Sequence, residues 1–94
     1  MSVPFSMGVV ATPDTLINVI GEESVLLNLT SERYFGLDDI GTHMWQVLIS
    51  SASIQIAYDT LLAEYDIEAD VLKRDLASFI AELSSRGLVD IRAV

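Results

Sequence analysis

In the first half of the chain, apolar residues form short runs that alternate with polar turns, a pattern typical of strands. The runs cover residues 16–20, 25–29 and 34–37, and the turn-forming segment 21–23 begins with a glycine. Strands joined by loops of a few residues favour an antiparallel meander. The sequence therefore predicts three antiparallel strands between residues 15 and 37.

Beyond Leu37 the apolar positions repeat at helical spacing. Asp38 or Asp39 is suited to cap a first helix, because a short carboxylate accepts hydrogen bonds from the unpaired amides of the first turn. The segment Ser50-Ser51-Ala52 is expected to end this helix, and Ser53 is suited to cap a second one. Two helices joined by a short break are therefore expected after the strands.

A third helix is expected over residues 68–86. Gly87 is well placed to end it in a left-handed conformation, and residues 88–91 then form a short strand or a packed tail. One side of this helix carries an apolar stripe of the width that faces a core. The stripe consists of Leu72, Leu76, Phe79, Ile80 and Leu83.

The order of these elements predicts an α+β fold. Three antiparallel strands followed by three helices match a winged helix-turn-helix-like arrangement. Residues 1–13 contain Pro4, Gly8 and Pro13 and are expected to be a flexible lead-in, with residues 14–94 as a single domain. Three helices leave part of a sheet uncovered, and we expect the short strand at residues 34–37 to lie at an open edge.

The charge balance argues against nucleic acid and anionic membranes as partners. The chain has 14 acidic and 5 basic residues, a formal net charge of −9, and no cysteine. Such a chain repels phosphate groups, and without cysteine it has no disulfide or thiolate metal site. No secretory signal or membrane-length apolar run is visible, so a cytoplasmic location is expected.

Nothing in the sequence points to catalysis. His43 is the only histidine, and a lone histidine is more often structural than catalytic. The adjacent pair Asp38 and Asp39 is better explained by helix capping than by acid–base chemistry. Zinc, calcium, phosphate-loop and dinucleotide motifs are absent from the sequence. We therefore expect no enzyme, no metal and no cofactor.

A peptide is the partner that fits the expected fold. An extended peptide can add a strand to an open sheet edge, with main-chain hydrogen bonds for affinity and side-chain pockets for specificity. The strand at residues 34–37 is expected to supply the edge, and the third helix the other wall of the groove. Tyr34 and Phe35 are adjacent in this strand, so their side chains point to opposite faces.

Residues 25–45, VLLNLTSERYFGLDDIGTHMW, resemble the PqqD-like family, also called RiPP recognition elements after ribosomally made and modified peptides. The second half is similar too, at residues 75–80 and 86–89, and the resemblance covers about residues 16–91. The segment 34–38, followed by Gly41 and Trp45, is most similar to the stand-alone proteins of lasso-peptide clusters.

The resemblance implies that the chain binds the leader segment of a precursor peptide by strand addition. It also implies that the bound peptide is presented to a separate, transglutaminase-like leader peptidase and to a cyclase. The residues expected to contact the peptide lie on the third strand and the third helix. They are Arg33, Tyr34, Phe35 and Gly36 on the strand, and Leu72, Asp75, Leu76 and Phe79 on the helix.

Two alternatives remain open at this point. The same fold can serve another peptide pathway, such as the maturation of the cofactor PQQ or of radical enzymes. The other alternative is a small acidic winged-helix regulator that binds DNA or a protein. The third helix, residues 68–86, carries three bases against four acids, a balance that weakens the DNA-binding alternative.

Overall fold

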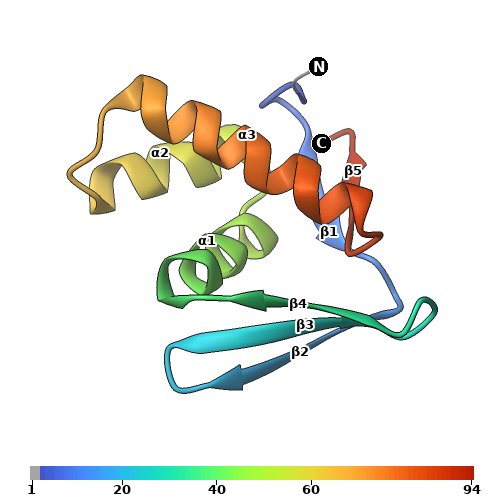
Figure 1. Ribbon diagram of the computed structural model, residues 1–94. Coiled ribbons are helices and arrows are strands. Elements are labelled where there is room, and N and C mark those ends of the chain that lie inside the picture. The colour runs from blue at the N-terminus through green and yellow to red at the C-terminus, as the bar shows by residue number, and fades with distance from the viewer. Residues whose placement is uncertain (1–2) are drawn as a thin grey trace.

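Three helices lie on one side of a three-stranded sheet in the computed structural model, which describes residues 3–94 (Figure 1). The strands are β2 (Thr15–Ile20), β3 (Glu23–Asn28) and β4 (Arg33–Leu37), antiparallel in the order β2-β3-β4. Gly21 has a φ of 65° in the turn between β2 and β3, a conformation that glycine adopts without strain. The predicted meander is confirmed, and β2 and β4 are its two edges.

The helices follow the predicted order, and two of the predicted caps are present. They are α1 (Asp39–Ser50), α2 (Ile54–Glu64) and α3 (Ala69–Ser85). The carboxylate of Asp38 accepts a hydrogen bond from the amide of Gly41 at 2.7 Å, and the Ser53 hydroxyl accepts one from the amide of Ile56 at 3.2 Å. No helix within residues 3–94 is long and apolar enough to cross a membrane.

The chain turns back after α3 at Gly87, which has a φ of 70°. The following residues form β5 (Val89–Arg92), the strand that the sequence left open between a strand and a tail. The antiparallel partner of β5 is β1 (Gly8–Ala11), and these two strands make a second sheet. The fold is therefore α+β as predicted, with one small sheet more than the sequence indicated.

The β1 strand corrects the expectation that residues 1–13 are a flexible lead-in. Val9 is buried in the core, and the amides of Ile54 and Gln55 donate to the carbonyl oxygens of Met7 and Phe5, both at 2.8 Å. No local pattern in the sequence indicates this pairing, because the partner strand lies about 80 residues further along the chain. Residues 3–13 are therefore part of the fold, and residues 1 and 2 of the predicted lead-in lie outside the described residues.

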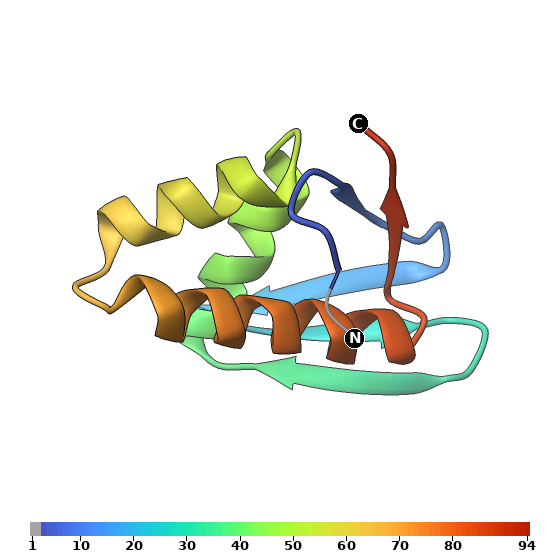
Figure 2. The same ribbon diagram turned by 90° about the horizontal axis from the view of Figure 1, so that it is seen from above.

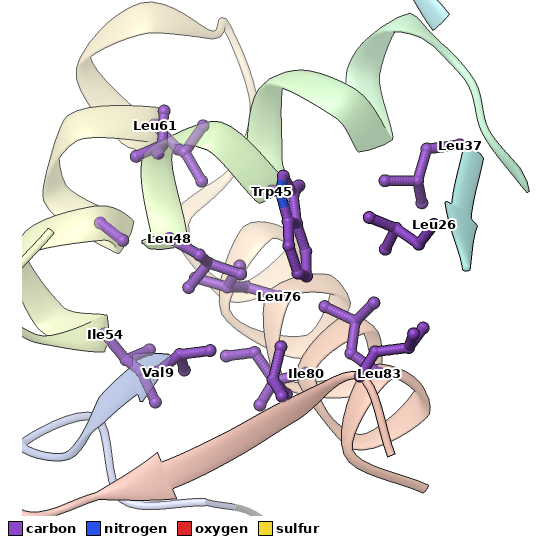
Figure 3. Close-up of a cluster of buried hydrophobic side chains, with 14 of the residues drawn as sticks. Val9, Leu26, Leu37, Trp45, Leu48, Ile54, Leu61, Leu76, Ile80 and Leu83 are labelled. Atoms are coloured by element: carbon purple, nitrogen blue, oxygen red, sulfur yellow. The ribbon is translucent and has the colours of Figure 1, made fainter. Parts of the chain in front are cut away.

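The core lies between the helices and the inner faces of the two sheets (Figure 3). Trp45 of α1 is buried there. The stripe on α3 points into the same cluster, except that Phe79 is only half-buried. Burial of each such side chain contributes roughly 1.5–3 kcal/mol. Side chains from all three helices and from β1, β3 and β4 meet in this cluster, among them Val9, Leu26, Leu37, Leu48, Ile54, Leu61, Leu76, Ile80 and Leu83.

Candidate functional site

The outer edge of β4 is open. Within residues 3–94, β4 pairs with β3 on one side and with no strand on the other. An open edge presents a row of backbone N–H and C=O groups that can pair with another extended chain. The edge strand predicted from the sequence is therefore in place.

The helix α3 forms the second wall beside this edge. Seen from above, α3 follows the length of β4 (Figure 2), and it lies on the side of the sheet that the helices cover (Figure 1). On β4 the side chains of Arg33, Phe35 and Leu37 face this side, because their β3 partners are the buried residues of that strand. The side chain of Tyr34 points to the opposite face, and Gly36 occupies the other position of β4 on that face.

A cavity of about 380 Å³ lies where the start of β4 meets the end of α3. The guanidinium of Arg86 lies over the ring of Phe35 at 4.6 Å from its centroid, a distance typical of a cation–π contact. The same guanidinium is held 2.8 Å from the carboxylate of Glu82. The cavity is thus lined by an aromatic ring and by charged side chains. Its lining comprises Asn28, Ser31, Arg33, Tyr34, Phe35, Ser85, Arg86 and Leu88.

Asn28 fixes the geometry of this cavity. Its side-chain nitrogen donates to the carbonyl oxygens of Arg86 and Gly87 at 3.2 and 3.3 Å. Its side-chain oxygen accepts from the amides of Thr30 and Ser31 at 3.0 and 3.3 Å. One largely buried side chain therefore ties the β3–β4 loop to the end of α3.

Of the predicted contact residues, four are exposed and two are half-buried. Arg33, Tyr34, Gly36 and Asp75 are exposed, whereas Phe35 and Phe79 are half-buried and pack against the core. Asp75 lies 3.7 Å from Arg74, in an exposed pair that contributes little. Its carboxylate therefore remains accessible to a ligand.

The two remaining predicted residues, Leu72 and Leu76, belong to the core. Leu72 is 4% exposed and Leu76 is 0% exposed, so they leave little or no surface for a peptide. Their place in the apolar stripe accounts for this, since the centre of such a stripe faces the interior. We therefore assign Leu72 and Leu76 to the core, where they support the helix wall, and not to the surface that contacts the peptide.

Sequence reasoning missed five residues that line the cavity: Asn28, Ser31, Ser85, Arg86 and Leu88. In the sequence, Arg86 is explained as a basic residue at the end of a helix. That explanation does not predict its contact with the Phe35 ring, 51 positions earlier. Asn28 has no local signal in a strand. Only the three-dimensional meeting of the β3–β4 loop with the end of α3 identifies them.

The lone histidine takes part in a contact between helices. The Nε2 atom of His43 on α1 lies 2.8 Å from the carboxylate of Glu64 on α2, and its ring packs edge-on against Tyr65. Burial raises the pKa of Tyr65 above its usual value, with a smaller contribution from Glu64 and Asp39. Residues 3–94 contain no group of three or more His, Cys, Asp or Glu side chains that could hold a metal ion.

Comparison with known proteins shows which family the chain resembles. Residues 23–89 match the family described as "Coenzyme PQQ synthesis protein D (PqqD)". The solved structure described as "TbiB1 in Complex with the TbiA(beta) Leader Peptide" is 30% identical, covers 86% of this chain and 94% of that chain, and has a TM-score of 0.80.

A second solved structure has the same fold. It is described as "Lasso peptide synthetase B1 complexed with the leader peptide", and its sequence is 24% identical. The match covers 87% of this chain and 96% of that chain, with a TM-score of 0.78. None of the curated proteins compared with the chain matches it.

Proposed function

Because the chain belongs to the PqqD family, we propose that it binds the leader segment of a ribosomally made precursor peptide as a strand added beside β4. The observation that carries the proposal is the open edge of β4 with α3 beside it. The 30% identical neighbour is a complex with a leader peptide, which agrees with this use of the groove.

The two faces of an added strand meet different surfaces. Side chains of a bound strand alternate between faces. Those on the helix side meet the Phe35 and Phe79 rings and the guanidinium of Arg86, and those on the opposite side lie beside Tyr34. Main-chain bonds to β4 supply affinity for any extended peptide, and these side-chain contacts select among peptides.

We further propose that the domain acts by binding alone and presents the peptide to separate enzymes. The partners that fit are a transglutaminase-like leader peptidase and a cyclase of a lasso-type system, and the compartment that fits is the cytoplasm. The cysteine-free sequence agrees with a reducing compartment, and the segment 34–38 carries the resemblance to lasso-type proteins. The same fold acting in PQQ or radical-enzyme maturation is the alternative.

Strand addition has a specific experimental signature. A labelled leader from the neighbouring precursor gene is titrated with the purified domain and followed by fluorescence anisotropy. We expect saturable binding. Methylation of single leader amides should weaken binding by about tenfold or more at alternate positions, whose N–H groups bond to β4, and have little effect between them. Saturable binding with no such alternation would contradict strand addition.

Variants of the domain locate the groove. Tyr34→Ala and Asp75→Asn should each weaken leader binding, because both side chains are exposed beside the proposed strand. The matched controls are Ile56→Ala on α2 and Asp70→Asn in the first turn of α3, which are exposed elsewhere. Equal affinity for all four variants would place the peptide outside this groove.

A further inference from the structure

The second edge of the three-stranded sheet, β2, is open and unprotected. Within residues 3–94, β2 pairs with β3 and with no other strand. Natural sheets usually protect such an edge with charged side chains, proline or a bulge. The sequence of β2, TLINVI, has no charge and no proline, and its register with β3 is continuous. An edge without these devices is a template for a further strand.

The apolar side chains of β2 are exposed on both faces of the sheet. Leu16 and Ile20, on the face away from the helices, are 53% and 66% exposed. Ile17 and Val19 point to the helix side, where their β3 partners are buried, yet they are 40% and 48% exposed. The helices therefore do not cover this strand. A strand placed beside β2 would shield its side chains on both faces at once.

The outward backbone groups of β2 belong to Ile17 and Val19. The amide of Leu29 donates to the carbonyl oxygen of Asp14 at 2.9 Å, so Asp14 bonds in the direction of β3. Because this direction alternates along an antiparallel strand, the even-numbered residues of β2 also bond toward β3. The N–H and C=O groups of the odd-numbered residues then point away from β3, toward the open edge.

Two β2 strands match each other in one antiparallel register. With a two-fold axis at Asn18, this residue faces Asn18 of the second copy, and the two amides can bond to each other. On the same face, Leu16 lies opposite Ile20 of the second copy. On the helix side, Ile17 lies opposite Val19, and these are the residues with outward backbone groups. Apolar side chains thus meet apolar side chains, and the backbone groups pair.

The neighbouring registers do not match. An axis one residue before Asn18 places Ile20 opposite Asp14 of the second copy, and an axis one residue after it places Leu16 opposite Glu22. An axis between two residues sets an outward backbone group against a residue that bonds toward β3, so no ladder forms. The pattern of β2 is therefore its own complement only around Asn18.

We propose that the domain self-associates through β2 as a two-fold dimer whose axis passes through Asn18. The two sheets join into one of six strands, with the β4 edges at its two ends. Both peptide grooves remain open, so the proposal does not depend on leader binding. Asp14 and Glu22 of opposite copies approach each other at the ends of the pairing, and the net charge is −9. The association is therefore weak and is strengthened by salt.

Cysteine cross-linking reads the register directly, because the chain has no cysteine. The pairs 18 with 18 and 16 with 20 are non-hydrogen-bonded ones, whose Cα atoms lie about 4.5 Å apart, within the range of a disulfide. Asn18→Cys should therefore form a disulfide dimer under mild oxidation. Leu16→Cys and Ile20→Cys should each remain monomeric and should cross-link when mixed. The control is Ile56→Cys, an exposed position on α2, which should remain monomeric.

These cross-links decide the register. Cross-linking of Ile56→Cys as fast as Asn18→Cys means random collision and overturns the proposal. Efficient cross-linking of Leu16→Cys alone means a different arrangement of the strands and overturns it too.

Sedimentation equilibrium tests the chain without cysteine. We expect a monomer–dimer equilibrium with a dissociation constant of roughly 10–100 μM, so that dilute solutions contain monomers, because a single pair of strands is a small interface. Raising the salt from about 0.05 M to about 0.5 M should tighten the dimer. A wild type that stays monomeric up to about 1 mM at both salt concentrations overturns the proposal.

Two edge variants complete the test. Ile17→Lys/Val19→Lys should weaken the dimer by about tenfold or more, because like charges then meet across the axis. Val19→Pro removes an outward N–H group and no bond to β3, so it should also weaken the dimer and leave the monomer folded. Circular dichroism checks the fold, and leader affinity should stay within about twofold of the wild type. Unchanged dimerisation in both folded variants overturns the proposal, whereas failure of the wild type to bind the leader rejects only the proposed function.

Discussion

The side-chain nitrogen of Asn28 donates a hydrogen bond to the carbonyl oxygen of Gly87 at 3.3 Å, across 59 positions of sequence. Asn28 ends the central strand, and Gly87 follows the last turn of α3. This contact joins the two walls of the proposed peptide groove at one end. The fold and the site therefore share a single polar junction, and its disruption affects both.

Replacement of Asn28 by alanine should reduce both stability and leader affinity. The substitution removes two donated and two accepted hydrogen bonds and leaves carbonyl oxygens of residues 86 and 87 without this partner. The expected loss is about 1–3 kcal/mol in the free energy of unfolding, measured by urea denaturation. The control is Asn18→Ala, an exposed asparagine on β2, which should change stability by less than about 0.5 kcal/mol. Equal effects of the two variants would show that the junction has no special role.

Gly87→Ala should destabilise the domain for two reasons. The φ of 70° is unfavourable for alanine, and a Cβ atom there would lie 2.9 Å from the side-chain nitrogen of Asn28. We expect a loss of roughly 1–2 kcal/mol in unfolding free energy. Gly36→Ala is the matched control, since its Cβ meets nothing within 4 Å and its φ is not positive. Thermal unfolding that is indistinguishable for the two variants would contradict the strain at Gly87.

Local signals in the sequence predicted the elements of the fold well. The Asp38 cap, the left-handed Gly21 and Gly87, and the apolar stripe on α3 each act within a few residues, and each is present. The open edge at β4 followed from the same pattern, because an element order of strands and then helices leaves an edge uncovered.

The features of the structure that the sequence did not predict depend on contacts between distant segments of the chain. The β1–β5 pairing joins the two ends of the chain, and the contact of Arg86 with Phe35 joins a helix end to a strand. No local pattern specifies either one. Periodicity also groups Leu76 with Phe79, although only Phe79 reaches the surface, because the helix faces the core along the centre of its stripe.

Arg86→Ala should weaken peptide binding and also lower stability modestly. Arg86 is exposed. Its ion pair with Glu82 is of the kind that contributes about 0.2–0.5 kcal/mol, and its contact with the Phe35 ring of the kind that contributes about 0.5–1 kcal/mol. Its loss removes the guanidinium that covers the Phe35 ring in the cavity, so leader affinity should fall by roughly fivefold. The lysine ammonium is not planar, so it cannot stack flat on an aromatic ring or form two parallel hydrogen bonds to one carboxylate. Arg86→Lys should therefore resemble the alanine variant.

Anisotropy titrations of both Arg86 variants check this expectation. The control is Arg92→Ala at the end of β5, an exposed arginine outside the cavity lining, which should bind the leader as the wild type does. If Arg86→Lys binds like the wild type, charge alone matters at this position and stacking on Phe35 does not.

The β1 strand provides the sharpest test of where the domain begins. Val9 is 3% exposed in the core, whereas the adjacent Val10 is 40% exposed on the same strand. Val9→Ala should cost about 1–3 kcal/mol of unfolding free energy through lost burial and a residual cavity, and Val10→Ala less than about 0.5 kcal/mol. The two substitutions delete the same atoms in the same strand, so their difference isolates packing against the core. Urea denaturation that gives equal midpoints for both would mean that β1 does not dock on the core in solution, and that residues 1–13 form the flexible lead-in that the sequence suggests.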